Sequence, residues 1–115
     1  MRFCPWYPLA AAAAHAPAGA GVLQLRLAHG LVDYPSGKSA MVHYEHAADA
    51  RARAGELAAA LAGRDLLCRH LEREPGDAGA TDWAAFHAKV RAEFVRRFGA
   101  EPAVPPAVPK LPPKL

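Results

Sequence analysis

Between residues 82 and 98 the chain repeats large apolar side chains at spacings of three and four. They are Trp83, Phe86, Val90, Phe94 and Phe98. Side chains at this spacing lie on one side of an α-helix, so the segment predicts an amphipathic helix with one apolar stripe. Thr81 is expected to cap its N-terminus and Gly99 its C-terminus. The stripe needs a surface to pack against, and we expect the rest of the chain to supply a sheet.

The chain has few other large apolar side chains with which to build a core. Of the 60 residues behind the 52% hydrophobic content, 28 are alanine and 32 are larger. A chain of 115 residues has the length of one domain, and 32 large apolar side chains suffice for one modest core. Charged residues make up 22%, too few for a wholly disordered chain. We therefore expect a single small folded domain.

Two segments alternate between apolar and polar side chains, which predicts β-strands. In residues 22–27 three leucines share one face and polar residues share the other, the pattern of a half-buried strand. Residues 40–45 alternate in the same way, and the glycine, proline and serine of residues 29–39 predict a turn before them. The two strands are therefore expected to pair antiparallel. Residues 65–72, with an apolar run at their centre, predict a third strand.

Two further helices complete the predicted fold. Residues 6–16 and 47–62 are rich in alanine, and Gly63 is placed to end the second helix in a left-handed conformation. The predicted fold class is α/β, more narrowly α+β, with a small three-stranded sheet flanked by helices. We place this domain at residues 1–101.

Residues 102–115 differ in composition and are assigned to a proline-rich tail. They contain six of the eleven prolines and repeat Pro-Ala-Val-Pro. Such a segment favours extended polyproline II, and we expect it to be disordered. Pro109, Pro112 and Lys114 match the loose pattern of a ligand for polyproline-binding domains, which would let the tail bind a protein. A plain tail without a partner is the alternative.

Charge and hydropathy limit the classes of partner. The net charge of +3 at pH 7 permits contact with nucleic-acid phosphates without requiring it. No stretch provides the ~18 apolar residues of a membrane-spanning helix, and prolines interrupt the N-terminal segment that resembles an export signal. The two cysteines, Cys4 and Cys68, match no disulfide framework. We therefore expect a cytoplasmic protein without membrane contact.

Two short patterns suggest ligand chemistry but lack the residues that would complete it. The string GKS at residues 37–39 resembles the end of a phosphate-binding loop, yet a strand is predicted after it in place of a helix. Lys38 remains available as a single phosphate contact. Cys68 and His70 would share a strand face, but zinc needs three or four ligands. A buried Cys68 thiol is the simpler interpretation.

Three local strings, taken in the order of the predicted elements, carry a family resemblance. They are GVL at residues 21–23, HYEHAADARAR at residues 43–53 and AEFVRRFG at residues 92–99. Across residues 17–102 the chain resembles the GIY-YIG nuclease superfamily. In that family two motif strands pair, an Asn or Asp follows them, an Arg comes four residues later, and a Glu lies on a later helix.

The resemblance implies a set of functional residues. Asp49 matches the Asn/Asp position, Arg53 the arginine and Glu93 the helix glutamate. It implies that Arg53 stabilises the charge that develops on the phosphate and that Glu93 holds a divalent metal, usually Mg²⁺. A guanidinium matches phosphate oxygens and a carboxylate suits a hard cation, so both roles agree with the chemistry of these side chains. Hydrolysis would also need an activated water.

The chain departs from the family at both motif tyrosines. The first position is Leu23, which cannot accept or position a proton; the second is His43, and Glu45 replaces the motif glycine. We therefore expect a catalytically impaired relative that acts by binding nucleic acid, either DNA or RNA, or a protein. Its expected nucleic-acid contacts are Lys38, Arg51 and Arg53.

Two other functions stay open. A divergent Mg²⁺-dependent phosphodiesterase or endonuclease would use Arg53, Glu93 and His43, with His43 as general base because imidazole titrates near neutral pH. An adaptor protein would act through the tail. The plainer alternatives give these residues no catalytic role. His43 would then be only a satisfied partner of a neighbouring strand, Arg53 an exposed helix residue and Glu93 a solvated one.

Overall fold

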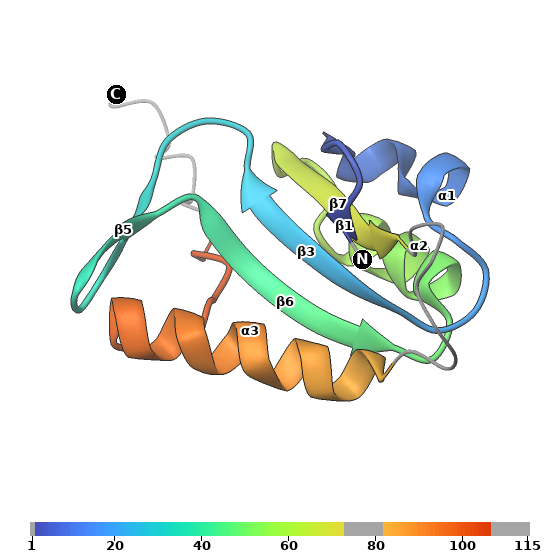
Figure 1. Ribbon diagram of the computed structural model, residues 1–115. Coiled ribbons are helices and arrows are strands. Elements are labelled where there is room, and N and C mark those ends of the chain that lie inside the picture. The colour runs from blue at the N-terminus through green and yellow to red at the C-terminus, as the bar shows by residue number, and fades with distance from the viewer. Residues whose placement is uncertain (1, 73–81, 107–115) are drawn as a thin grey trace, which may run out of the picture.

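Three long antiparallel strands form the centre of the fold. The computed structural model describes residues 2–72 and 82–106 (Figure 1). Strand β3 (Gly21–Leu27) lies in the middle, with β6 (Met41–Ala47) on one side and β7 (Leu66–Glu72) on the other. Both pairings are antiparallel, which confirms the pairing predicted for the first two strands. The protein is a mixed α/β fold with an antiparallel sheet, as its sequence pattern predicts.

Two short N-terminal strands enlarge the sheet beyond the predicted three. Strands β1 (Arg2–Phe3) and β2 (Tyr7–Pro8) each pair antiparallel with β7. The helix predicted at residues 6–16 is therefore wrong over its first half. After β2 come a 3₁₀ turn, η1 (Leu9–Ala11), and a four-residue helix, α1 (Ala12–His15). Pairing with the edge of β7 outweighs the local preference of this segment for helix.

Helices cover both faces of the sheet. Helix α2 (Ala50–Ala60) packs its buried alanines and a leucine in the same core cluster as Leu23. Helix α3 (Trp83–Phe98) runs along β3 and β6 in Figure 1, where Phe94 contacts Tyr44. Strand β3 is consequently buried over its first five residues, so the prediction of a half-buried strand is wrong. A central strand with a helix on each face has no solvent-exposed side.

A small β-hairpin occupies the predicted turn at residues 29–39. Its strands β4 (Val32–Tyr34) and β5 (Gly37–Ser39) pair antiparallel with each other. Pro35 and Ser36 form the tip of the hairpin, and the residues on either side of them pair with each other. The many turn-forming residues in this segment predicted only a turn and not these two short strands. The amide of Ser36 donates to the Phe98 carbonyl at 3.0 Å. The hairpin thereby supports the C-terminal end of α3.

Side-chain caps define the starts of both long helices. Helix α2 begins three residues later than predicted because β6 continues to Ala47, and the Asp49 carboxylate accepts from the Ala52 amide at 3.1 Å. Helix α3 is capped by Asp82, which accepts from the Ala85 amide at 2.8 Å. The predicted cap, Thr81, lies outside the described residues.

Two glycines adopt the left-handed conformation predicted for them. Gly63 follows α2 with φ of +82° and Gly99 ends α3 with φ of +80°. The expected helix end at residue 62 is two residues too late, because α2 stops at Ala60.

Within residues 2–72 and 82–106, no helix has both the length and the apolar character needed to cross a bilayer.

Replacing Gly99 by alanine is expected to destabilise the fold by about 2 kcal/mol, because a left-handed alanine is strained. A Cβ at this position would also meet Pro35 Cβ at 3.2 Å and Ser36 Oγ at 2.8 Å. Gly63→Ala is the matched control, with a similar φ and no atom within 4 Å, and should cost about 1 kcal/mol. Urea unfolding measures both, and equal losses would show that crowding by the hairpin contributes nothing.

The first residues of the predicted tail lie against the domain. Val104 packs against the core, and the Arg64 guanidinium donates a hydrogen bond to the Pro105 carbonyl. Residues 107–115, which include the whole predicted polyproline-domain ligand, lie outside the described residues. The disorder of that segment and its adaptor role therefore stay predictions.

Candidate functional site

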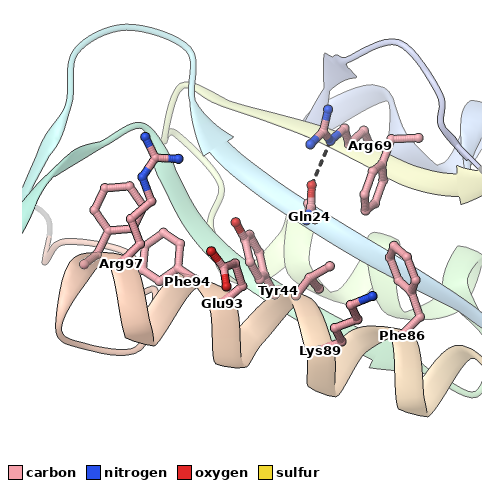
Figure 2. Close-up of a pocket in the computed structure, with 11 residues that line it drawn as sticks. Gln24, Tyr44, Arg69, Phe86, Lys89, Glu93, Phe94 and Arg97 are labelled. Carbon is pink, nitrogen blue, oxygen red and sulfur yellow. Dashed lines mark hydrogen bonds between the residues drawn. The ribbon is translucent and has the colours of Figure 1, made fainter.

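Helix α3 contacts the sheet through only part of its apolar stripe. Phe94 is its one buried residue, whereas Phe86, Val90 and Phe98 are each partly exposed. A groove of about 490 Å³ lies between these side chains and the sheet (Figure 2). The prediction that the stripe packs on the sheet is thus confirmed for Phe94 and holds only in part for its neighbours.

Arg69 of β7 forms the charged part of the groove wall. Its guanidinium lies 4.3 Å from the ring centre of Phe3 and 4.4 Å from that of Trp6. Its Nε donates to Oε1 of the buried Gln24 at 2.8 Å, the bond drawn in Figure 2. Burial lowers the pKa of Arg69 from its usual value, but an arginine stays charged at neutral pH. The fold therefore holds a rigid cation at this wall.

Aromatic rings line the rest of the groove. Tyr44 meets Phe94 edge-on, with ring centres 5.5 Å apart, and Phe94 in turn packs on Phe98 at 4.6 Å. At the other end Phe86 contacts Phe3 at 6.1 Å. Burial raises the pKa of Tyr44, so its hydroxyl is a neutral hydrogen-bonding group. Flat apolar surfaces and a phenol thus share one groove.

Two exposed cations of α3 stand at the rim. Figure 2 shows Lys89 and Arg97 on the same side of the helix, with Glu93 between them. The Glu93 carboxylate accepts from Arg96 Nε at 3.0 Å, and this hydrogen bond lowers the pKa of Glu93. Because Arg96 already neutralises Glu93, the charges of Lys89, Arg97 and Arg69 leave the groove positive.

The sequence-predicted residues His43 and Arg53 meet at Glu45. His43 Nε2 donates to Glu45 Oε1 at 2.9 Å, and Arg53 Nε donates to Glu45 Oε2 at 2.5 Å. Burial by itself would raise the pKa of Glu45, but the hydrogen bonds from Arg53 and His43 outweigh it and the pKa falls. Glu45 raises the pKa of Arg53 in return. The cluster is therefore one carboxylate held by an arginine at one oxygen and by a histidine at the other.

Glu93 lies on the opposite face of the sheet from this cluster. Neighbouring strand residues point to opposite faces. Tyr44 contacts α3, so His43 and Glu45 face the other way, toward Arg53 of α2. Leu23 pairs with Glu45 in register and is fully buried beneath α2. The structure therefore brings His43, Arg53 and Leu23 to one face and does not bring Glu93 to them.

The surroundings of Glu93 do not fit a magnesium site. Its two oxygens are bonded to Arg96, and a hard cation would need further oxygen ligands. In the part of the chain that the structure describes, the one group of three potential ligand side chains lies elsewhere, at the β1–β7 edge. Mg²⁺ thus keeps only the support of the family resemblance.

The other predicted nucleic-acid contacts are separated from one another. Lys38 is exposed on β5 and lies 3.5 Å from the carboxylate of Asp33. Arg51 is on the first turn of α2, where its Nε donates to the Ala16 carbonyl at 2.9 Å. Arg53 is held by Glu45. Each of these cations has a hydrogen bond or an ion pair within the protein. Among the described residues Lys89 and Arg97 have neither, although Arg97 lies 5.4 Å from the ring centre of Phe98.

Sequence reasoning missed the groove residues Gln24, Tyr44 and Arg69. A partial signal was present: Gln24 stands between two leucines of β3, and Arg69 stands between the buried Cys68 and His70 of β7. The register places Gln24 between Tyr44 and Arg69 on one face, which no local pattern reports.

Comparison with known protein families, with curated proteins and with solved structures finds no match to this chain.

Proposed function

We propose that this protein is a nucleic-acid-binding domain, a degenerate relative of the GIY-YIG nucleases that holds single-stranded DNA or RNA in the groove between α3 and the sheet. The observation that carries the proposal is the combination of aromatic rings and cationic side chains in one groove. Single strands are bound by cations that follow the phosphates and by aromatic side chains on which bases stack. The groove supplies both.

The composition of the groove favours a single strand over a duplex. In a duplex the bases are stacked on each other and unavailable to Phe86 or Tyr44. A splayed base can enter a cavity of about 490 Å³ and stack on an aromatic wall, while Lys89 and Arg97 contact phosphates outside it. Gln24 and Tyr44 offer polar atoms near the floor.

The separation of the family residues supports binding rather than cleavage. A metal held at Glu93 would lie across the sheet from Arg53, so the two could not act on one phosphate. Leu23, fully buried, offers no proton chemistry at the position where the family has tyrosine.

Binding is tested by fluorescence anisotropy of a labelled single-stranded oligonucleotide at increasing salt. We expect binding at low salt that weakens steeply as salt rises. Lys89→Ala and Arg97→Ala should each weaken binding several-fold and lower the salt slope by about 1. Arg91→Ala is the matched control, because Arg91 lies on the same helix but pairs with Glu101 at 2.7 Å.

Three outcomes would contradict the proposal. They are absence of binding at low salt, equal losses in all three variants, and a loss confined to Arg51→Ala or Arg53→Ala, which would move the interface to α2. Thermal melting of each variant shows whether it is folded.

A phosphodiesterase is the second candidate, favoured by the contact of His43 and Arg53 with one carboxylate. Denaturing gels of the same oligonucleotide, incubated with Mg²⁺, separate it from the first. We expect the oligonucleotide to stay intact. Cleavage that disappears in Arg53→Ala, and persists in Lys89→Ala, would instead establish an enzyme on the α2 face.

A further inference from the structure

Three potential metal ligands converge where the N-terminal segment crosses β7. Cys4, which directly follows β1, has its Sγ 3.4 Å from Nδ1 of His70. Nε2 of the same ring lies 3.5 Å from a carboxylate oxygen of Glu72. One ligand atom from each residue can be chosen so that all three lie within 4.8 Å of one another. His70 and Glu72 lie 66 or more positions after Cys4 in the sequence, so only the fold brings the three together.

The cluster is built into the backbone pairing and is open to solvent on one side. The Cys4 amide donates to the His70 carbonyl at 2.9 Å, and the His70 amide donates to Cys4 Sγ at 3.4 Å. Cys4 and His70 are each 7% exposed, whereas Glu72 is on the surface. A pocket of about 320 Å³, also lined by Tyr7 and His15, gives an ion a path to them.

The geometry of the cluster matches the demands of zinc. With bonds of about 2.3 Å to sulfur and 2.0 Å to nitrogen, a tetrahedral ion holds neighbouring ligand atoms roughly 3.5 Å apart. The sulfur–nitrogen distance already has this value. The Glu72 side chain, 45% exposed, is free to turn toward the ion without disturbing the core. The Tyr7 hydroxyl lies 2.9 Å from the same His70 Nδ1, so a zinc ion bound at this nitrogen replaces that hydrogen bond.

We propose that Cys4, His70 and Glu72 bind one thiophilic divalent cation, Zn²⁺, at the junction of β1 and β7. Thiolate and imidazole select zinc over Mg²⁺ or Ca²⁺, which prefer oxygen ligands only. Binding displaces the thiol proton of Cys4 to solvent, and a water occupies the fourth position of the ion. The site fastens the N-terminal segment to the sheet.

Cobalt(II) is the spectroscopic probe, because a tetrahedral cobalt–thiolate centre shows visible d–d bands and a near-ultraviolet charge-transfer band. The full-length protein, purified with reductant and stripped with chelator, is titrated with Co²⁺ and then with Zn²⁺. We expect both bands at one equivalent of Co²⁺ and their loss when Zn²⁺ displaces it. Cys4→Ser should remove the charge-transfer band.

Two further variants make the test specific. Cys68→Ala removes a nearby buried thiol, whose Sγ lies 3.6 Å from the Tyr7 hydroxyl, and should leave the spectrum unchanged. Glu72→Gln alters an exposed side chain, so the variant should fold, and we expect it to bind Co²⁺ at least 10-fold more weakly. Zn²⁺ at 100 times its Kd should raise the Tm of the native protein by about 10 °C and that of Cys4→Ser by much less.

The proposal fails if the native protein gives no charge-transfer band, or if Cys4→Ser keeps the band. It also fails if Cys68→Ala loses the band, because the thiol ligand would then be Cys68. If Glu72→Gln binds Co²⁺ with the affinity of the native protein, Glu72 is not a ligand and the three-residue site is wrong.

Discussion

Replacing Phe94 by alanine is expected to lower the free energy of unfolding by about 3–5 kcal/mol, a large share of the ~5–15 kcal/mol of a typical domain. Phe94 is 4% exposed and its ring contacts those of Tyr34, Tyr44 and Phe98. Removing it opens a cavity where the hairpin, the sheet and α3 meet. Urea unfolding followed by circular dichroism measures the loss.

Phe86→Ala is the matched control for this prediction. Phe86 lies on the same helix and lines the groove, but it is only partly buried and has one aromatic contact, with Phe3. We expect a loss of about 1–2 kcal/mol, because less apolar surface leaves the protein interior. If Phe86→Ala were as destabilising as Phe94→Ala, α3 would be anchored along its whole length and the groove would be closed.

Replacing Arg69 by methionine is expected to cost about 2–3 kcal/mol although methionine retains an unbranched apolar stem like that of arginine. The change leaves Oε1 of Gln24, which is 3% exposed, without its donor, at about 1–3 kcal/mol. It also removes two cation–π contacts, with Phe3 and Trp6, worth about 0.5–1 kcal/mol each. Thermal and urea unfolding both report this loss.

A double-mutant cycle identifies the cause. Gln24→Leu combined with Arg69→Met removes donor and acceptor together, so the pair should be less destabilised than the sum of the singles by about 1 kcal/mol or more. Additive losses would mean that the hydrogen bond contributes nothing and that Arg69 acts only through its stacking on the rings.

The N-terminal segment connects the two proposed sites. Phe3 and Trp6 hold Arg69 at the groove, while Cys4, between them in sequence, contacts His70, one of the proposed zinc ligands of β7. Ordering of Cys4 by a metal would therefore also order the aromatic residues that position the groove cation.

Much of the local structure could be predicted from the sequence. The strands within residues 22–27, 40–45 and 65–72 and the helix at residues 82–98 follow from periods of two and of three to four residues. The left-handed Gly99 follows from its place after the last apolar residue of α3. Period and helix-end preferences act between residues close in the chain, so they can be read directly.

The errors and omissions have one physical origin, which is competition between local preference and distant partners. Residues 7–8 pair with β7 although the segment around them favours helix, and residues 32–39 pair with each other despite their turn composition. The candidate site residues show the same division. Asp49 caps a helix through a residue three positions away, which a local pattern can predict, whereas the contact of Arg53 with Glu45 depends on how α2 lies on the sheet.

The sequence by itself thus determined the kind and order of the main elements, the left-handed glycine after each long helix and the amphipathic face of α3. Only the tertiary structure decided that Glu93 and Arg53 lie on opposite faces, that α3 leaves a groove beside Arg69, and that Cys4 meets His70. Each of these depends on strand register and on the distance between a helix and a sheet. Both are set by side chains far apart in the sequence, whose packing no local pattern encodes.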